Sequence, residues 1–406
     1  MHKVYAIIAL FLTGFCRPVP GAWGEQFAYK HTAGDKYRIL STVHEDVYVD
    51  RRLAFRSEIL NRIAVEVLRA GNGSGFHRAL FQVAERALLS GRNAGGQSFQ
   101  WAREYESEFE RDRLGHITID RRFYMPVVRN VPVFPDRDLK NGETWSAEGH
   151  EMHDFRDSYG IAEPYRIPFN ANYTFLGNRE WKGKTYPAFS VSYRIFFEPE
   201  PARGTVWPRR IMGASDQIVF WDSVLGQELS YTEEFRMILE LSDGRTIEYR
   251  GTAEAEIVEA PKLDKERVVE DINRDIARMG IDDARARVVD DGVAISLENV
   301  QFQAESAALL GTEQTKLDKI AEILRRYPDR DILVGGHTAM AGTEEGRAQL
   351  SRERAASVAE YLIGKKVRAP ERVVVRGYGA EQPLGDNGTE EGRRKNRRVE
   401  ITILEN

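Results

Sequence analysis

Cysteine is almost missing from this chain, whose 406 residues include a single cysteine, Cys16. One thiol excludes an intramolecular disulfide, and removal of the segment around it would leave no thiol for catalysis. Long apolar runs are missing as well. The run VYAIIALFLTGF at 4–15 is well short of the ~20 residues that a membrane-spanning helix needs.

An excess of positive charge is also missing. The chain has 58 basic and 63 acidic side chains and a net charge of −5, so no overall field would attract nucleic acid. The basic cluster GRRKNRR at 392–398 is short and has no aromatic residues between its charges, which argues against a nucleic-acid patch. No G-x-S-x-G elbow supplies a hydrolase nucleophile. We therefore predict no nucleic-acid partner, no cofactor and no enzyme activity.

The first 24 residues have the composition of a secretory signal peptide. A short polar start precedes the apolar run, and PVPGAWG follows it with small residues at Ala22 and Gly24. We predict cleavage after Gly24 and export to the periplasm, with an association with the outer membrane left open. The alternative is a lipoprotein acylated at Cys16. Phe15 argues against it, because the processing enzyme prefers a small residue before the cysteine.

Residues 27–258 have mostly the pattern of antiparallel β-structure. Short runs rich in Val, Ile, Tyr and Phe, such as KYRIL, EDVYVD and FSVSYRIFF, are separated by turn signals such as LSDGRT. The segment FHRALFQVAERALLSG at 76–91 has apolar residues at helical spacing, so one helix is expected there. We predict an N-terminal β-rich domain over 25–125 and a second antiparallel domain over 126–258.

Two glycine-rich segments resemble nucleotide-binding loops only in part. GNGSGF at 71–76 has Phe76 in place of the third glycine of a dinucleotide-binding turn, and its flanking strands look antiparallel. GNREWKGKT at 177–185 has one residue too many between its glycines for a P-loop and has strands on both sides. We interpret the first as a glycine turn and the second as a hairpin turn.

The segment GHEMHDF at 149–155 brings His150, Glu151 and His153 together in the sequence. A metalloprotease helix would need two histidines four residues apart, with the glutamate as base. These histidines are three apart, in a segment that lacks a convincing helical pattern and a third ligand. We therefore predict no metal site here.

The pattern changes after about residue 260, where charged residues at helical spacing replace the alternation. The expected elements that follow are a strand at 293–302, a helix at 312–326, a strand at 331–336, a helix at 343–364 and strands at 372–379 and 397–404. Alternating strands and helices predict a sheet with helices on one face. The predicted fold class is therefore α+β and multidomain, with a β-rich N-terminal region and a C-terminal domain over 262–406.

A glycine-rich elbow, GGHTAMAG at 335–342, joins a strand to the longest predicted helix, a geometry that brings backbone close to a bound partner. On that helix, Arg354 is four residues from both Leu350 and Val358, so it points along the apolar stripe. An arginine there must reach water or meet an anion. The alternative, an arginine satisfied by a local carboxylate, is equally consistent with its position.

Five segments of this region resemble the OmpA-like peptidoglycan-binding domain, which OmpA-type outer-membrane proteins, peptidoglycan-associated lipoproteins and flagellar stator proteins share. They are VQFQAESAAL, GGHTAMAG, LSRERAASVAEYL, RVVVRGYGAEQPLGDN and GRRKNRRVEI, in the order and spacing of the family. The resemblance covers about residues 285–406. It implies a βαβαββ sandwich, which agrees with the order of elements predicted from the residues.

The resemblance also implies a ligand, the stem peptide of peptidoglycan. In the family, an aspartate in the elbow pairs with the ligand and an arginine on the following helix holds its carboxylate. Arg354 matches that arginine, whereas Ala339 stands in place of the aspartate and Arg347 in place of a common asparagine. The candidate peptidoglycan-binding residues are Arg354, Thr338, Arg347 and Arg398.

Two hypotheses remain open at this stage. In the first, the chain is a non-enzymatic bacterial envelope protein whose C-terminal domain contacts peptidoglycan with weakened or altered specificity, because Ala339 replaces the aspartate. In the second, it is a structural or interaction protein whose domain keeps the fold and no longer binds peptidoglycan. In both, the β-rich region is expected to contact other envelope proteins.

Overall fold

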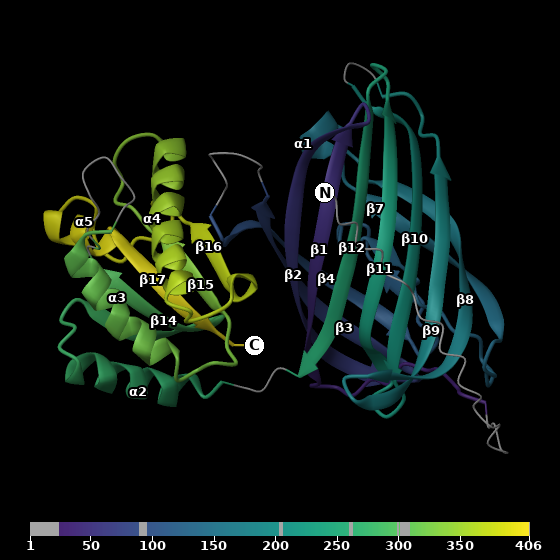
Figure 1. The fold of residues 1–406 in the computed structure, drawn as a ribbon, viewed down its shortest axis with the longest axis horizontal. Helices are drawn as coiled ribbons and strands as arrows, with labels where there is room; N and C mark the ends of the chain where they lie inside the picture. The colour runs from purple at the N-terminus through teal and green to yellow at the C-terminus, as the bar shows by residue number, and fades with distance from the viewer. Residues whose placement is uncertain are drawn as a thin grey trace, which may run out of the picture.

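The computed structural model describes residues 24–88, 96–202, 206–259, 263–298, 300 and 309–405. The predicted signal peptide, Cys16 and most of VQFQAESAAL lie outside these residues. The described chain is rich in strands and has five α-helices, so the α+β class is confirmed (Figure 1). In this described part, no helix combines the length and the apolar character needed to cross a bilayer.

The described residues of the N-terminal part form twelve strands and one short helix. They are β1 (Lys36–Val49), β2 (Arg52–Gly71), β3 (Ser74–Ala87), β4 (Phe99–Asp112), β5 (Ile117–Ile119), β6 (Val128–Arg129), β7 (Thr144–His153), α1 (Arg156–Tyr159), β8 (Tyr165–Trp181), β9 (Lys184–Phe197), β10 (Pro208–Asp222), β11 (Gln227–Leu241) and β12 (Thr246–Glu259).

These strands form one curved antiparallel sheet (Figure 1). Strand β1 pairs with β2 on one side and with β12 on the other, and the order across the sheet is β5-β4-β3-β2-β1-β12-β11-β10-β9-β8-β7-β6. The segments 25–125 and 126–258 therefore share this sheet. They meet at the β1–β12 pairing, and the predicted division between them falls between the edge strands β5 and β6.

Alternation of buried and exposed side chains explains why these segments are strands. In β8, Ile167, Phe169, Ala171, Tyr173 and Phe175 are buried and the residues between them are more exposed. Successive side chains of a strand point to opposite faces, so this pattern buries one face only. The buried face joins an aromatic core with side chains from β9, β10 and β11.

The helix predicted at 76–91 is wrong, because its described residues up to Ala87 belong to strand β3. The Ala, Leu and Glu content favours a helix locally. However, β3 pairs along its length with both β2 and β4, and these tertiary contacts override the local preference. The two glycine-rich segments are turns, as predicted: one joins β2 to β3 and the other joins β8 to β9.

In the C-terminal part, the residues that the structure describes form five strands, four α-helices and one 3₁₀ turn. They are α2 (Lys265–Arg278), β13 (Ala284–Val289), β14 (Gly292–Glu298), α3 (Gly311–Leu324), β15 (Ile332–Gly336), α4 (Glu344–Gly364), η1 (Pro370–Arg372), β16 (Val373–Gly377), α5 (Glu390–Asn396) and β17 (Arg398–Leu404).

The C-terminal strands lie in the order β13-β14-β17-β15-β16, with only the β15–β16 pair parallel. Helices α2, α3 and α4 cover one face of this sheet (Figure 1). Their apolar side chains and the inward side chains of the strands form a single core. Each element predicted from residue 293 onward has a counterpart of the same type in the same order, whereas α5 and η1 were not predicted.

The other face of the C-terminal sheet packs against the N-terminal sheet. Leu333, Val374 and Leu404 form a small core with Leu60 and Phe99. Strand β16 also forms a short parallel pairing with β4 of the N-terminal sheet. The two parts of the chain are therefore joined by backbone pairing as well as by side-chain contacts.

Candidate functional site

The glycines of the elbow GGHTAMAG allow close packing of helix α4. A Cβ on Gly336, the last residue of β15, would overlap the carbonyl oxygen of Ser351 in α4. A Cβ on Gly377, at the end of β16, would lie 2.7 Å from Ser351 Oγ. Only glycine fits at such contacts. The backbone that approaches Gly336 most closely is thus that of α4, whereas the sequence pattern suggested a bound partner.

His337 and Thr338 attach the elbow to the end of β16. The ring of His337 stacks on Tyr378, with the centroids 4.8 Å apart, and the Thr338 N–H donates to the Gly379 carbonyl over 2.7 Å. Both side chains are buried. Burial, with the charge of Arg398 as a smaller cause, lowers the pKa of His337 to about 3. The elbow histidine is therefore neutral at neutral pH.

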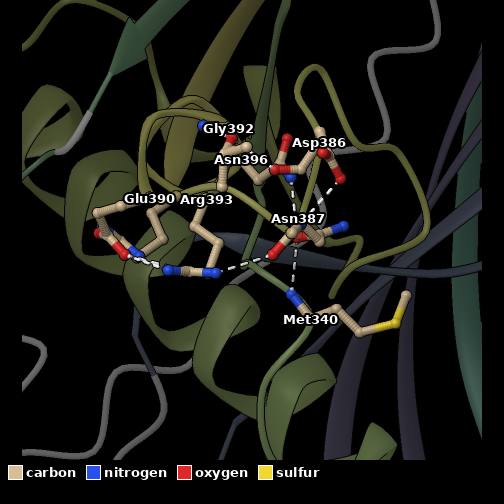
Figure 2. Close-up of polar contacts among 10 residues, drawn as sticks. Met340, Asp386, Asn387, Glu390, Gly392, Arg393 and Asn396 are labelled. Atoms are coloured by element: carbon tan, nitrogen blue, oxygen red, sulfur yellow. Dashed lines mark hydrogen bonds and ion pairs between the residues drawn. The ribbon is translucent and has the colours of Figure 1, made fainter.

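The position of the expected aspartate carries only a methyl group. Ala339 is 7% exposed, whereas the next residue, Met340, is 60% exposed. The Met340 N–H donates to Asn387 Oδ1 over 3.1 Å, as Figure 2 shows. The elbow is thereby attached to the loop that precedes α5.

Asn396 holds this loop in place (Figure 2). Its side chain is fully buried. Its Oδ1 accepts hydrogen bonds from the N–H groups of Leu384 and Gly385 at 2.8 and 2.9 Å. Its Nδ2 donates to the Gly385 carbonyl and to Asn387 Oδ1, both at 2.9 Å. Asn387 thus connects a buried anchor to the elbow.

Helix α4 carries Arg354 half-buried beside the core residues Ala355 and Val358. Burial lowers the pKa of the Arg354 guanidinium, and the charge of Arg397 lowers it further. Arg397 donates to Glu390 Oε1 over 2.7 Å. Val358 is buried as predicted, whereas Leu350, which the sequence placed on the same stripe, is 40% exposed. A second guanidinium, that of Arg397, lies within electrostatic range of Arg354.

Arg347 lies at the start of α4 and covers the end of the elbow. Its Nη1 donates to the Gly342 carbonyl over 2.7 Å, and its own N–H donates to the carbonyl of Thr343, which caps the helix. The side chain is half-buried. Arg347, Thr338 and Ala339 therefore all belong to the elbow and its junction with α4.

The Arg398 carbonyl accepts the His337 N–H of the elbow over 3.0 Å, but the Arg398 side chain lies on the face of the sheet away from α4. Its neighbours in β17, Val399 and Ile401, face the helices, so Arg398 points to the opposite face of the sheet from α4. It is 3% exposed, and its Nε donates to Glu400 Oε1 over 2.7 Å. Glu400 also accepts two hydrogen bonds from Arg287. The structure does not bring Arg398 together with Arg354.

Sequence reasoning missed the contact between Asn387 and Met340. The stretch GDNG at 385–388 contains turn-forming residues, which is a signal for a loop but not for its partner. Asn396 lies in GRRKNRRVEI, the last of the five segments that carry the resemblance. Its four hydrogen bonds give it a structural role.

The segment GHEMHDF lies in strand β7 and its following loop, not in a helix. His153 Nε2 is 2.7 Å from Glu151 Oε2, and the hydroxyl of Tyr193 donates to Glu151 Oε1 over 2.8 Å. His150 points to the other face of the strand, because side chains alternate. Within the described ranges, no group of three or more His, Cys, Asp or Glu side chains could hold a metal ion.

Comparison with known proteins identifies the C-terminal part. Residues 301–397 match the model of the OmpA family. The peptidoglycan-binding protein ArfA of Mycobacterium tuberculosis is 36% identical over 104 residues, which are 26% of this chain and 32% of ArfA. The probable lipoprotein YiaD of Escherichia coli is 39% identical over 105 residues, which are 26% of this chain and 48% of YiaD.

A solved structure, the cell wall anchor of the T6SS from Pseudomonas aeruginosa, is 28% identical and has a TM-score of 0.29. The match covers 33% of this chain and 96% of that structure. The chain spans between about a third and a half of the length of the curated relatives it matches. No family model matches the N-terminal part. Residues 301–397 are an OmpA-family domain.

Proposed function

We propose that this chain is an exported, non-enzymatic protein of the bacterial envelope, whose OmpA-family domain contacts the stem peptide of peptidoglycan. Its place would be the periplasm, close to or associated with the outer membrane. The name of the relative ArfA describes a peptidoglycan-binding protein, and YiaD is named a probable lipoprotein. The N-terminal sheet would contact other envelope proteins.

The observation that carries this proposal is the arrangement of charge around the elbow. Arg354 and Arg397 lie within electrostatic range of each other, Arg397 is also paired with Glu390, and position 339 contributes no carboxylate. Such a site favours the carboxylates of a stem peptide over a zwitterionic end that also carries an ammonium group. Loss of one hydrogen bond to a charged group weakens binding by roughly 10- to 150-fold. We therefore propose weak binding or altered specificity.

Co-sedimentation of the full chain with isolated sacculi tests the proposal. We expect a measurable fraction of the protein to sediment, and Arg354→Ala to lower the apparent affinity by about tenfold or more. Arg352→Ala is the matched control, because Arg352 is exposed on the same helix and should sediment like the parent. Sedimentation of the parent no greater than that of an unrelated protein would end the proposal.

The alternative is an OmpA-family domain that serves as a structural module. In its favour, one face of the domain's sheet packs against the N-terminal sheet through a small apolar core and through the β4–β16 pairing. In this case the sacculi would retain neither the parent nor Arg354→Ala. Crosslinking through the N-terminal sheet would then recover an envelope protein.

A further inference from the structure

The N-terminal sheet encloses an apolar cavity that is remote from the OmpA-family domain's elbow. Its volume is about 140 Å³, and strands β4, β3, β2, β1, β12 and β11 contribute its walls. The apolar walls include Ile39, Ile63, Val65, Phe81 and Ile257. Because these residues alternate with others along their strands, they all belong to one face of the sheet.

One end of this cavity is polar and leads toward the surface. Tyr37, Arg111 and Glu228 line both the apolar cavity and a neighbouring cavity of about 370 Å³. Lys30 and Lys36, which are exposed, also line the larger cavity. The three shared residues therefore stand between an apolar interior and a solvent-facing entrance.

Arg111 brings a positive charge to this boundary. Its guanidinium lies 4.6 Å from the centre of the Tyr29 ring. Its Nε is buried and has no hydrogen-bond partner in the described part of the chain. Glu228 lies near enough to interact with it electrostatically, but Glu228 Oε1 accepts the Tyr29 hydroxyl at 2.6 Å. A buried N–H donor without a hydrogen-bond partner is costly unless something pairs with it.

Two histidines beside Arg111 are neutral. Burial lowers the pKa of His77 to about 3 and also lowers that of His31, with the Arg111 charge as the second cause in both. His77 is 2% exposed and lines the larger cavity. Its Nδ1 and His31 Nε2 are further buried atoms without hydrogen-bond partners among the described residues. Several buried polar atoms without hydrogen-bond partners among the described residues therefore lie at the polar end of the cavity.

We propose that the two cavities form a binding site for an amphiphilic carboxylate, with the head group at Arg111 and the apolar tail among Ile39, Ile63 and Phe81. The carboxylate would accept charge-assisted hydrogen bonds from Arg111. A cavity of about 150 Å³ lined by apolar side chains holds the six carbons of benzene. The smaller cavity, of about 140 Å³, therefore suits about six carbons of a tail, with the carbon next to the head group at the boundary beside Arg111. Glu228 opposes the ligand's charge and limits the affinity.

Calorimetric titration of the full chain with octanoate tests this site without any substitution. We expect one octanoate to bind per chain. Octan-1-ol, which has the same tail without the charge, should bind roughly 10- to 150-fold more weakly. Octyltrimethylammonium, which reverses the charge of the head group, should not bind. No heat with octanoate, or equal affinity for octanoate and octan-1-ol, would overturn the proposal.

Two substitutions should change the affinity in opposite directions. Arg111→Gln removes the cation and should weaken octanoate binding by about tenfold or more, whereas Glu228→Gln removes the competing anion and should strengthen it. Arg78→Gln is the control, because Arg78 is exposed and pairs with Glu108 across the surface. If Arg111→Gln fails to fold, the affinity of Glu228→Gln for octanoate tests the site instead. Weaker binding by a folded Glu228→Gln, or unchanged binding by a folded Arg111→Gln, would refute the site.

Discussion

Arg62 Nη1 lies 2.6 Å from Asp331 Oδ2 at the contact between the two parts of the chain, and each side chain is 5% exposed. Arg62 belongs to β2 of the N-terminal sheet, whereas Asp331 precedes β15 of the OmpA-family domain. Asp331 Oδ1 also accepts from Arg372 Nε over 2.6 Å. One buried carboxylate therefore serves two guanidinium groups from different parts of the chain.

Asp331→Ala should strongly destabilise the protein, because it leaves a buried arginine without its counter-ion. Removing one partner of a buried ion pair costs about 3–5 kcal/mol, which we expect as a loss in the free energy of urea unfolding. Asp46→Ala is the control, because its partner Arg56 is about half exposed and such pairs contribute about 0–1 kcal/mol. Equal losses in the two variants would contradict the role given to Asp331.

Asn396→Ala should destabilise the loop that holds the elbow. The substitution leaves the N–H groups of Leu384 and Gly385 without their acceptor, and each buried unsatisfied group costs about 1–3 kcal/mol. Amide hydrogen exchange should then accelerate at Leu384, Gly385 and Met340. Exchange at Val334, in the centre of β15, reports the rest of the domain. Acceleration at Val334 equal to that at Met340 would mean global rather than local loosening.

The fold was predictable where local pattern and structure agree. The alternation in FSVSYRIFF, which forms part of β9, and the order of the predicted elements after residue 293 are properties of short segments, and the structure confirms them. The strand β3 was mistaken for a helix because its pairing with β2 and β4 decides its conformation. The pairing of β1 with β12 joins segments about two hundred residues apart, and no local pattern indicates it.

The candidate site was predictable only in its main features. The resemblance located the elbow, Arg354 and the missing aspartate at Ala339. It did not indicate that Asn387 contacts the elbow, because a loop's partner depends on the packed structure. Nor did the resemblance indicate that the Arg398 side chain lies on a different face of the sheet from Arg354. Arg398 and Glu400 share a face of β17 that packs away from α4, and strand alternation is the signal that could have revealed this.

Ala339→Asp should raise the affinity for peptidoglycan if the rest of the site is intact. The added carboxylate could pair with the ammonium group of a stem-peptide side chain, a gain of roughly 10- to 150-fold in affinity. Calorimetry with soluble muropeptides that carry a diaminopimelate residue would measure it. Ala341→Asp is the control, because Ala341 is exposed two residues along the elbow. A folded Ala339→Asp with no higher affinity than Ala341→Asp would favour the structural alternative.

His337→Phe should make the protein less sensitive to acid. The pKa of His337 is lowered to about 3 in the folded state, chiefly by burial, whereas an unfolded histidine has a pKa of about 6.5. Between these values the unfolded chain binds more protons than the folded chain, so the free energy of unfolding falls as the pH falls. The ring nitrogens of His337 have no hydrogen-bond partner in the described residues. Phenylalanine would therefore keep the stacking on Tyr378 without losing a hydrogen bond.

Urea unfolding of the parent and His337→Phe at pH 8, 6, 5 and 4 measures this difference. At pH 8 neither state of the parent binds the proton, so that value is the internal reference. Below about pH 6.5 the variant should gain stability over the parent by up to about 1.4 kcal/mol per pH unit. His77 acts in the same direction as His337, whereas Glu45, whose pKa burial raises to about 7, acts in the opposite direction. Both residues remain in the variant, so their contributions to the free energy of unfolding cancel in the comparison. Parallel profiles for the two proteins would contradict the prediction, because they would show that His337 binds its proton equally well in the folded and unfolded states.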